Sequence, residues 1–262
     1  MREMIDISYS SLALGYLLLI APLALVLIYR VPVARGLAVS VLRMTLQLLF
    51  VGLYLQVVFD MDRWWLTGLW LMAMVAAADL SVLRESGLRA GRLWAPAFLA
   101  IFLGTLLPLG YFVRIVLRAP EFMAPQYVIP IGGMIMGNCL RAVIIGAGRF
   151  YRSIEESRSH YEYSLACGAS LREATAPHMS RAMHEALSPT IATMMTIGLV
   201  SLPGMMTGIL MAGASPAEAI KYQIAIMISI LTGTVLTVVL GIELTRRRAF
   251  TPFGVLRQDT LR

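Results

Sequence analysis

Residues 162–190 read EYSLACGASLREATAPHMSRAMHEALSPT, and residues 191–213 continue as IATMMTIGLVSLPGMMTGILMAG. The first segment carries mixed charge, whereas the second is apolar over roughly the 20 residues that a helix needs to cross a bilayer. Ser170 and Glu173 form an S-x-x-E capping box, which predicts a helix that begins just after Gly168. We therefore expect a short, charged, cytoplasmic helix next to a membrane span.

This short helix has two interpretations. It could dock a soluble partner protein, or it could lie on the membrane surface as an ordinary amphipathic loop. Pro177 is expected to limit its length, and Ser188-Pro189 has the form of an N-cap and first turn for the next helix. Ser153 and Glu156 form a second capping box, which predicts another helix ahead of it.

Composition and charge place the chain in a membrane. Of 262 residues, 58% are hydrophobic and 14% are charged, and the apolar residues form long continuous runs. Continuous rather than alternating runs predict an all-α polytopic membrane protein surrounded by lipid, instead of a β-barrel. The net charge of +7 would suggest a nucleic-acid partner for a soluble protein. Here the positive-inside rule explains that charge, and we expect no nucleic acid.

The basic residues exclude ATP binding through a Walker A phosphate loop in this sequence. All of the 22 basic residues are arginine except Lys221, which lies in IKYQ with no preceding glycine. A Walker A phosphate loop requires G-x-x-x-x-G-K-[ST], so the sequence contains no such site. The sequence also shows no combination of nucleophile, general base and orienting residue that would form a catalytic site. We expect a chain that is not an enzyme and that binds no cofactor of its own.

Seven membrane spans can be drawn within one transmembrane domain that covers residues 1–262. Their approximate limits are 11–29, 37–58, 64–83, 93–117, 126–148, 187–212 and 217–244. The last begins at Ser215-Pro216-Ala217-Glu218, which has an N-cap, a proline and a glutamate in their preferred places. Most arginines then fall on one side, including those of the long loop 149–186 and of the C-terminal tail. This predicts an external N-terminus and a cytoplasmic C-terminus in the inner (plasma) membrane of the cell.

Ionisable side chains occur inside three of the predicted spans. Arg43, Asp79 and Arg141 all fall in the inner half of the bilayer, where such groups are costly and must face the bundle or water. One interpretation is a polar floor to a translocation pathway. The alternative is a structural Arg–Asp pair, or arginines whose long side chains reach the nearby interface.

Small residues indicate where helices can approach one another closely. Gly133 and Gly137 are four residues apart, as are Gly204 and Gly208. Such pairs are typical of helix–helix contacts in membranes. We expect a homodimer in which the fifth and sixth spans supply much of the central packing.

The sixth predicted span contains Pro203, which removes a backbone hydrogen bond and should kink or break the helix. Unpaired backbone at membrane depth is tolerated beside a cavity, so Pro203 and Gly204 are predicted to line the pathway. Thioether sulfur and amide oxygen could hold a metal ion there, or the methionines could simply fill the core. The candidate metal ligands are Met134, Asn138, Met205 and Met206.

Residues 162–170 resemble the coupling segment of ABC importer permeases, E-A-A-x-x-x-G-A-[ST]. The matching positions are Glu162, Gly168, Ala169 and Ser170, and Tyr163 and Ser164 stand in place of the alanines. A closer resemblance is to the iron export permease family FetB, which also includes plant aluminium-tolerance permeases. It is carried by QYVIPIGGMIMGN at 126–138, GLVSLPGMMTG at 198–208 and AIKYQI at 219–224.

The resemblance implies a permease subunit that works with a separate ATP-hydrolysing subunit, as two permeases and two ATPases. ATP and Mg²⁺ would then be bound by the partner, and the cargo would be iron or a related metal ion. The partner-coupling residues would be Glu162, Gly168, Ala169, Ser170, Arg172 and Glu173. Alternatives are an ABC permease for a non-metal substrate and a secondary transporter driven by an ion gradient. The second alternative needs carboxylates deep in the membrane, where only Asp79 and Glu243 come near.

Overall fold

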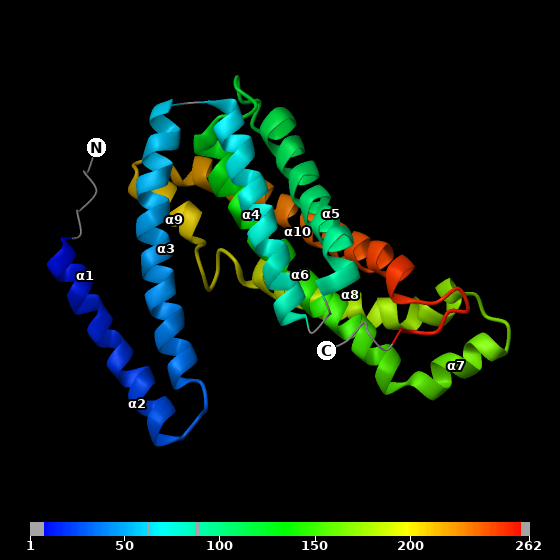
Figure 1. Ribbon diagram of the computed structural model, residues 1–262. Helices are drawn as coiled ribbons and strands as arrows, with labels where there is room; N and C mark the ends of the chain where they lie inside the picture. Colours follow the sequence, from blue (N-terminus) through cyan, green and yellow to red (C-terminus); the bar gives the residue numbers. More distant parts are fainter. Residues whose placement is uncertain (1–7, 62, 87–89, 258–262) are drawn as a thin grey trace. The chain divides into compact units, whose positions relative to one another are not determined.

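The computed structural model describes residues 8–61, 63–86 and 90–257, and helices account for most of them (Figure 1). Within those ranges the β pairing consists of two isolated bridges, Ile197 with Ser201 and Phe250 with Leu256. The stretches long and apolar enough to cross a membrane are Tyr9–Ile28, Ala34–Met61, Trp64–Val82, Leu93–Val116, Pro125–Glu156 and Pro216–Ala249. The fold is therefore all-α and polytopic, as the continuous apolar runs predict.

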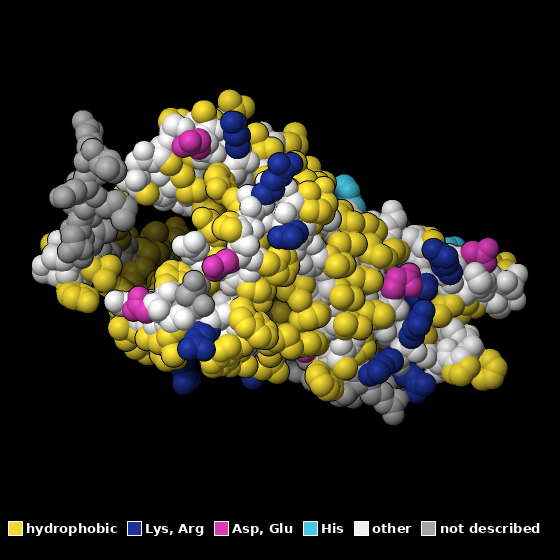
Figure 2. Space-filling model, turned by 90° about the horizontal axis from the view of Figure 1, so that it is seen from above, with side chains coloured by type: hydrophobic (Ala, Val, Ile, Leu, Met, Phe, Trp, Pro, Cys, Tyr) yellow, Lys and Arg dark blue, Asp and Glu magenta, His cyan; other side chains and the backbone are white. Residues whose placement is uncertain are grey.

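Hydrophobic side chains cover much of the surface. Figure 2 shows them over a large part of the displayed face, with acidic and basic side chains scattered among them and several of these at the end that α7 (Arg158–Ala166) occupies in Figure 1. Water tolerates apolar patches of this extent poorly, whereas lipid accommodates them. The surface thus agrees with a chain that lies mostly in a membrane.

The predicted span at 187–212 is not one continuous helix. α8 (Leu171–Thr196) ends before it, and α9 (Gly204–Met211) begins after an irregular segment. Ile197 leaves the helical region with ψ 135°, and Gly198 follows with φ +84°. The break expected at Pro203 is confirmed, but it starts six residues earlier. Its cause is the left-handed backbone at Gly198, whose N–H donates to the carbonyl of Ser201 over 2.9 Å.

The helix boundaries predicted at Pro177 and Ser188-Pro189 are wrong. α8 runs through both prolines, and the Ser188 hydroxyl donates to the His184 carbonyl over 2.6 Å instead of capping a new helix. Each proline removes one backbone hydrogen bond. α8 nevertheless continues because it packs along α6 (Pro125–Glu156), burying small side chains such as Ala182 and Ala186. Tertiary packing of this kind outweighs local propensity.

The second predicted capping box, at Ser153 and Glu156, is also wrong. α6 continues through both residues, and the Ser153 hydroxyl donates to the Phe150 carbonyl within the helix. Its residues around Phe150 and Tyr151 are fully buried, so the core holds this segment as a helix. α7 begins only after Ser157.

The chain separates into two compact units. The first comprises Met1–Asp62 with Met211–Gly213. In it, α1 (Tyr9–Gly15), η1 (Tyr16–Leu19) and α2 (Ile20–Ile28) form a helical stretch that returns as α3 (Ala34–Met61). A hydrogen bond joins the hydroxyl groups of Tyr16 and Thr45 between the two arms of this hairpin.

The second unit comprises Arg63–Leu210 with Ala214–Arg262 and holds the main core. α10 (Pro216–Ala249) packs against α5 (Ala90–Tyr111), α6 and α8, and α6 also contacts α4 (Trp64–Glu85). The short η2 (Phe112–Val116) extends α5. The capping box predicted at Ser215 and Glu218 starts α10 and is confirmed. That both units form one transmembrane domain stays a prediction.

Helices α5 and α10 cross closely. A Cβ atom placed on Gly233 would stand 2.8 Å from the carbonyl oxygen of Gly104, so the crossing requires glycine there. The glycines singled out from the sequence behave differently. A Cβ atom on Gly133 would stand 3.3 Å from the Met74 side chain, whereas one on Gly137, Gly204 or Gly208 would meet nothing within 4 Å in the described chain. The last three positions are open in a single copy, and the predicted homodimer stays a prediction.

Candidate functional site

A cavity of about 270 Å³ lies in the second unit, between α6, α8, α10 and the irregular segment that precedes α9. Successive turns of each helix supply its walls, because residues three and four apart share one helical face. The side chains that matter below are Met134, Asn138 and Arg141 of α6, Thr190 and Thr193 of α8, Pro203 of the break, and Gln223 and Met227 of α10.

The amide groups of the cavity are held in different ways. Asn138 Nδ2 donates a 2.8 Å hydrogen bond to the Met134 carbonyl one turn earlier, which fixes the orientation of that amide. Gln223 is 7% exposed, and its Oε1 atom is buried with no hydrogen-bond partner among the described residues. A buried amide oxygen without a donor is uncommon. Gln223 therefore has acceptor capacity that a bound molecule or water could use.

The charge of the cavity is positive. Arg141 is the only ionisable side chain among the described residues that line it. The hydroxyl of Thr193 is occupied by the Pro189 carbonyl at 2.9 Å, which leaves its oxygen as an acceptor. The lining thus combines one guanidinium with amides, hydroxyls and two thioethers, and the described part includes no carboxylate.

The structure brings together only part of the predicted pathway. Met134, Asn138 and Pro203 line the cavity, whereas Gly204, Met205 and Met206 are outside its described lining. Met205 packs against the apolar core, and Met206 is 8% exposed. That Met134, Asn138, Met205 and Met206 ligate a metal stays a prediction, and the position of Met205 and Met206 outside the described lining argues against the last two.

Several cavity residues were missed from the sequence. They are Thr190, Thr193, Gln223 and Met227. Gln223 lies within AIKYQI, and a polar residue four positions before Met227 on an apolar helix was a usable signal. Thr190 and Thr193 carried no comparable signal because threonine is common in membrane helices.

The three ionisable residues predicted to form a polar floor, Arg43, Asp79 and Arg141, lie in different parts of the structure. Arg141 lines the cavity, while Asp79 of α4 is 4% exposed and its Oδ1 atom has no hydrogen-bond partner in the described ranges. No ion pair between described residues joins the two side chains. Arg43 is an exposed residue of α3 in the first unit. That all three form one pathway stays a prediction.

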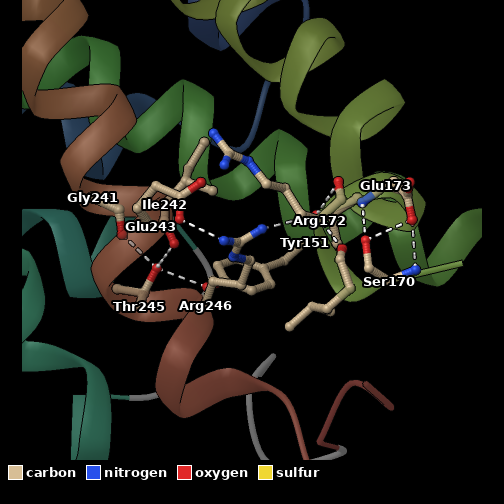
Figure 3. Close-up of polar contacts among 11 residues, drawn as sticks. Tyr151, Ser170, Arg172, Glu173, Gly241, Ile242, Glu243, Thr245 and Arg246 are labelled. Atoms are coloured by element: carbon tan, nitrogen blue, oxygen red, sulfur yellow. Dashed lines mark hydrogen bonds and ion pairs between the residues drawn. The ribbon is translucent and has the colours of Figure 1, made fainter. Parts of the chain in front are cut away.

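The exposed turn between α7 and α8 has the predicted cap. The Ser170 side chain accepts from the Glu173 N–H over 3.3 Å, and the Glu173 carboxylate accepts from the Ser170 N–H over 2.8 Å (Figure 3). Hydrogen bonds from the Ser170 hydroxyl and then from its backbone N–H hold the pKa of Glu173 below its usual value. On α7, Glu162 accepts a 2.7 Å hydrogen bond from Arg158.

Gly168 is required at this turn by its backbone conformation. A Cβ atom there would meet nothing within 4 Å, so space is not the constraint. The constraint is the backbone angle, since φ is +93° and only glycine adopts such a value freely. Next to it, Ala169 is half-buried against the core, whereas Arg172 is exposed.

A buried cluster that the sequence did not reveal holds α7 in place. The Tyr161 hydroxyl donates to the Gly254 carbonyl over 2.6 Å, and burial raises the pKa of Tyr161 to about 12. His178 Nδ1 and Ser153 Oγ form a 2.9 Å hydrogen bond between α8 and α6. The ring of Phe250 packs near Tyr161, with centroids 6.2 Å apart. The segment after α10 therefore folds back onto α7.

The end of α10 is bonded to both α6 and α8 (Figure 3). The Tyr151 hydroxyl of α6 donates to Thr245 Oγ1 over 2.7 Å. Arg246 Nη1 donates to Thr175 Oγ1 of α8 over 3.3 Å, and the same guanidinium pairs with Glu243 at 2.6 Å. These bonds join the beginning of α8 to the helix that carries Gln223.

α8 connects the two features described above. Its first turn is capped at Ser170 beside the exposed turn, and Thr190 and Thr193 in its last two turns line the cavity. A helix of 26 residues is about 39 Å long at 1.5 Å per residue. One helix thus runs from the exposed turn to the cavity wall.

These features define a class: a multi-pass α-helical membrane protein with a largely apolar cavity that carries a few polar side chains and is joined by one helix to an exposed, capped turn. Within that class the chain belongs to the UPF0014 family, described as an uncharacterised protein family, whose sequence profile matches residues 9–250. One relative within this family is named a probable permease.

Relatives with curated names extend over most of the chain. It is 31% identical to "Probable iron export permease protein FetB" of Escherichia coli over 94% of this chain and 93% of the relative. It is 36% identical to a UPF0014 membrane protein of Synechocystis sp., covering 75% and 76% of the two chains. It is 35% identical to "Protein ALUMINUM SENSITIVE 3" of Arabidopsis thaliana, covering 72% and 67%. The resemblance to the iron export permease family is confirmed, and no solved structure matches the chain.

Proposed function

We propose that this chain is the permease subunit of an ABC transporter that exports iron or a related metal, with ATP hydrolysed on a separate subunit. The observation that carries the proposal is the continuity of α8 between the capped turn and the cavity. A soluble ATPase that moves the turn at Ser170 displaces the cavity wall at Thr190 and Thr193. Such rigid-body motion of a helix is a common means of switching transporters.

The exposed turn is suited to docking. Gly168, Ser170, Arg172 and Glu173 are all exposed there, and the buried bonds of Tyr161 and His178 support the turn from beneath. A rigid base with an exposed, mixed-charge tip can transmit force without deforming. We assign this turn to the cytoplasm, with an external N-terminus, because the arginine-rich ends of the spans then lie inside.

The cargo is assigned from the relatives. One relative is named a probable iron export permease, and another is named for sensitivity to aluminium. Both names concern metals, which supports a metal cargo in the inner membrane for this chain. Met134 and Met227 add soft sulfur groups to the cavity lining.

The assembly consists of two copies of this chain and two ATPase subunits. Gly137 and Gly208 have no neighbour within 4 Å of a Cβ position, so each leaves room for a helix of a second copy. Isoleucine at Gly137 should weaken that dimer while the isolated chain still folds. Cross-linking in native membranes measures the effect, and a stable wild-type monomer there would contradict the dimer.

Purification from native membranes tests the proposal. A stoichiometric P-loop ATPase should accompany the chain, and its ATP hydrolysis should respond to the permease. Valine at Gly168 strains a residue with φ +93° and should uncouple or release the partner. Gly213 offers a matched control, since its φ is +92° and it also has nothing within 4 Å. Full ATPase stimulation after Gly168→Val would contradict the coupling role, and absence of any ATPase would favour a gradient-driven transporter.

A further inference from the structure

We propose that the cavity between α6, α8 and α10 receives its metal as an anionic, oxygen-rich complex, such as a hydroxycarboxylate chelate, and not as a bare cation. This inference rests on the proposed function, because it names the chemical form of the cargo for the same cavity. It is carried by Arg141, Asn138 and Gln223, three polar side chains that line the cavity from two helices.

The first step is electrostatic. Arg141 is always positively charged, and the described lining holds no carboxylate that could neutralise either it or an incoming cation. Arg141 is exposed in the described chain, so solvent screens its charge in part, but a divalent or trivalent ion that approaches it still meets like charge. Hard metal ions are bound by proteins through several carboxylate or carbonyl oxygens, which compensate for their lost hydration. The described residues provide a guanidinium in that place.

The second step concerns what a guanidinium binds well. Arginine presents a planar set of donors that matches a carboxylate or phosphate group with two parallel hydrogen bonds. A cargo with net negative charge would pair with the Arg141 guanidinium, and the repulsion between arginine and metal cation would disappear. Asn138 keeps one N–H free after its bond to the Met134 carbonyl, and it lies one turn before Arg141 on the same face. Together they form a donor surface for anionic oxygen.

The third step concerns the opposite wall. On the α10 side of the cavity, Gln223 Oε1 is a buried hydrogen-bond acceptor, and no described residue donates to it. Oε1 is enclosed in this structure, so a hydroxyl group on the cargo would supply a donor once the Gln223 amide turns toward the cavity. A ligand with both carboxylate and hydroxyl groups would thus satisfy both walls, whereas a bare ion would contact the amide oxygens and thioethers but leave Arg141 without an anionic partner.

The volume of the cavity does not distinguish a chelate from a hydrated ion, whereas its charge does. At roughly 30 Å³ of liquid volume per water, about 270 Å³ corresponds to roughly nine waters, enough for a small chelate or for a hydrated ion. Size therefore admits both forms of cargo. The charge of Arg141 discriminates between them.

The experiment uses the purified complex of permease and ATPase with three separate probes: ferric citrate, citrate alone, and ferrous chloride under anaerobic conditions without chelator. Binding is measured by titration calorimetry, and ATP hydrolysis is followed in parallel. Wild type should bind ferric citrate and respond to it. Arg141→Gln should weaken that binding by about tenfold or more, because a charge-assisted hydrogen bond is lost. Arg141→Lys, which keeps the charge but not the planar donor set, should lose less.

Arg114→Gln is the matched control, since Arg114 is an exposed residue of η2 outside the described cavity lining. Retention of the ATPase by each variant shows that it folds. Equal binding of ferrous ion by wild type and Arg141→Gln, with no binding of ferric citrate, would overturn the inference and leave metal export standing. Binding of citrate but of neither iron species would support an anion site and contradict iron as cargo. No binding by any probe would also overturn the inference.

Discussion

The Tyr161 hydroxyl donates a 2.6 Å hydrogen bond to the carbonyl of Gly254, joining α7 to a segment 93 positions later in the chain. Gly254 has φ +78° and sits in a turn where its own N–H donates to the Thr251 carbonyl. The leucine side chain of Leu165 lies 3.2 Å from the position of a Cβ atom on Gly254. The chain after α10 thus supports the helix that leads to the exposed turn.

Removal of this bond should loosen α7. Tyr161→Phe leaves the Gly254 carbonyl without its partner and should destabilise the protein by about 1–3 kcal/mol. Thermal unfolding in detergent measures the loss, and proteolysis between α7 and α8 should become faster. Tyr163→Phe is the control, because Tyr163 is 68% exposed and its change should stay within about 0.5 kcal/mol. Equal stability of Tyr161→Phe and wild type would contradict the bracing role.

Acidification should weaken the same region through His178. Burial, followed by the nearby charges of Arg181 and His160, lowers the pKa of His178 below 6.5 in the folded state. The unfolded chain then binds more protons in the window below pH 6.5, so stability rises with pH through it. Stability is fully present above 6.5 and is lost as the pH falls through the folded pKa.

Unfolding measured between pH 7.5 and 5 should therefore show a slope that His178→Gln reduces. His184 is the matched control, since it is an exposed residue of the same helix. A His184→Gln protein should keep the wild-type slope. An unchanged slope in His178→Gln would show that another group is responsible.

The crossing of α5 and α10 should not accept a methyl group. Gly233→Ala places a Cβ atom 2.8 Å from the Gly104 carbonyl and 2.9 Å from Ile135, which should cost about 1–3 kcal/mol through overpacking. Gly52→Ala gains the same helix propensity at an open, exposed position of α3 and should be neutral or slightly stabilising. Thermal unfolding of the two variants side by side gives the comparison. A Gly233→Ala protein as stable as Gly52→Ala would mean that the helices separate readily.

Methionine sulfur on α9 should be dispensable for transport. Met205→Leu and Met206→Leu keep side-chain volume, and neither residue belongs to the described cavity lining. Metal-dependent ATP hydrolysis and metal efflux should match wild type in the double variant. The same substitution at Met134 and Met227, which line the cavity, tests whether sulfur matters there. Loss of the metal response in the α9 variant alone would place the site at the break instead.

Much of this protein follows from local sequence. Its continuous apolar runs are long enough to cross a membrane. Lipid offers no hydrogen-bond partner to the backbone, so these runs must form helices that satisfy their own N–H and C=O groups. The capping boxes at Ser170 and Ser215 start helices where expected, since a side-chain oxygen needs only a backbone N–H three residues away. The break near Pro203 is local too, because a proline without an N–H and a glycine with φ +84° act on their own backbone.

Tertiary structure decided the other helix boundaries and the position of the cavity. Ser153 carries the same capping pattern as Ser170, yet the buried surroundings of Phe150 and Tyr151 keep it inside α6. Pro177 and Pro189 fail to end α8 because packing along α6 offsets two lost hydrogen bonds. Arg141 and Gln223 are 82 positions apart and meet at one cavity only because α6 and α10 pack together. A capping pattern acts within one turn of helix, whereas a cavity depends on which helices pack together, and no short stretch of sequence encodes that.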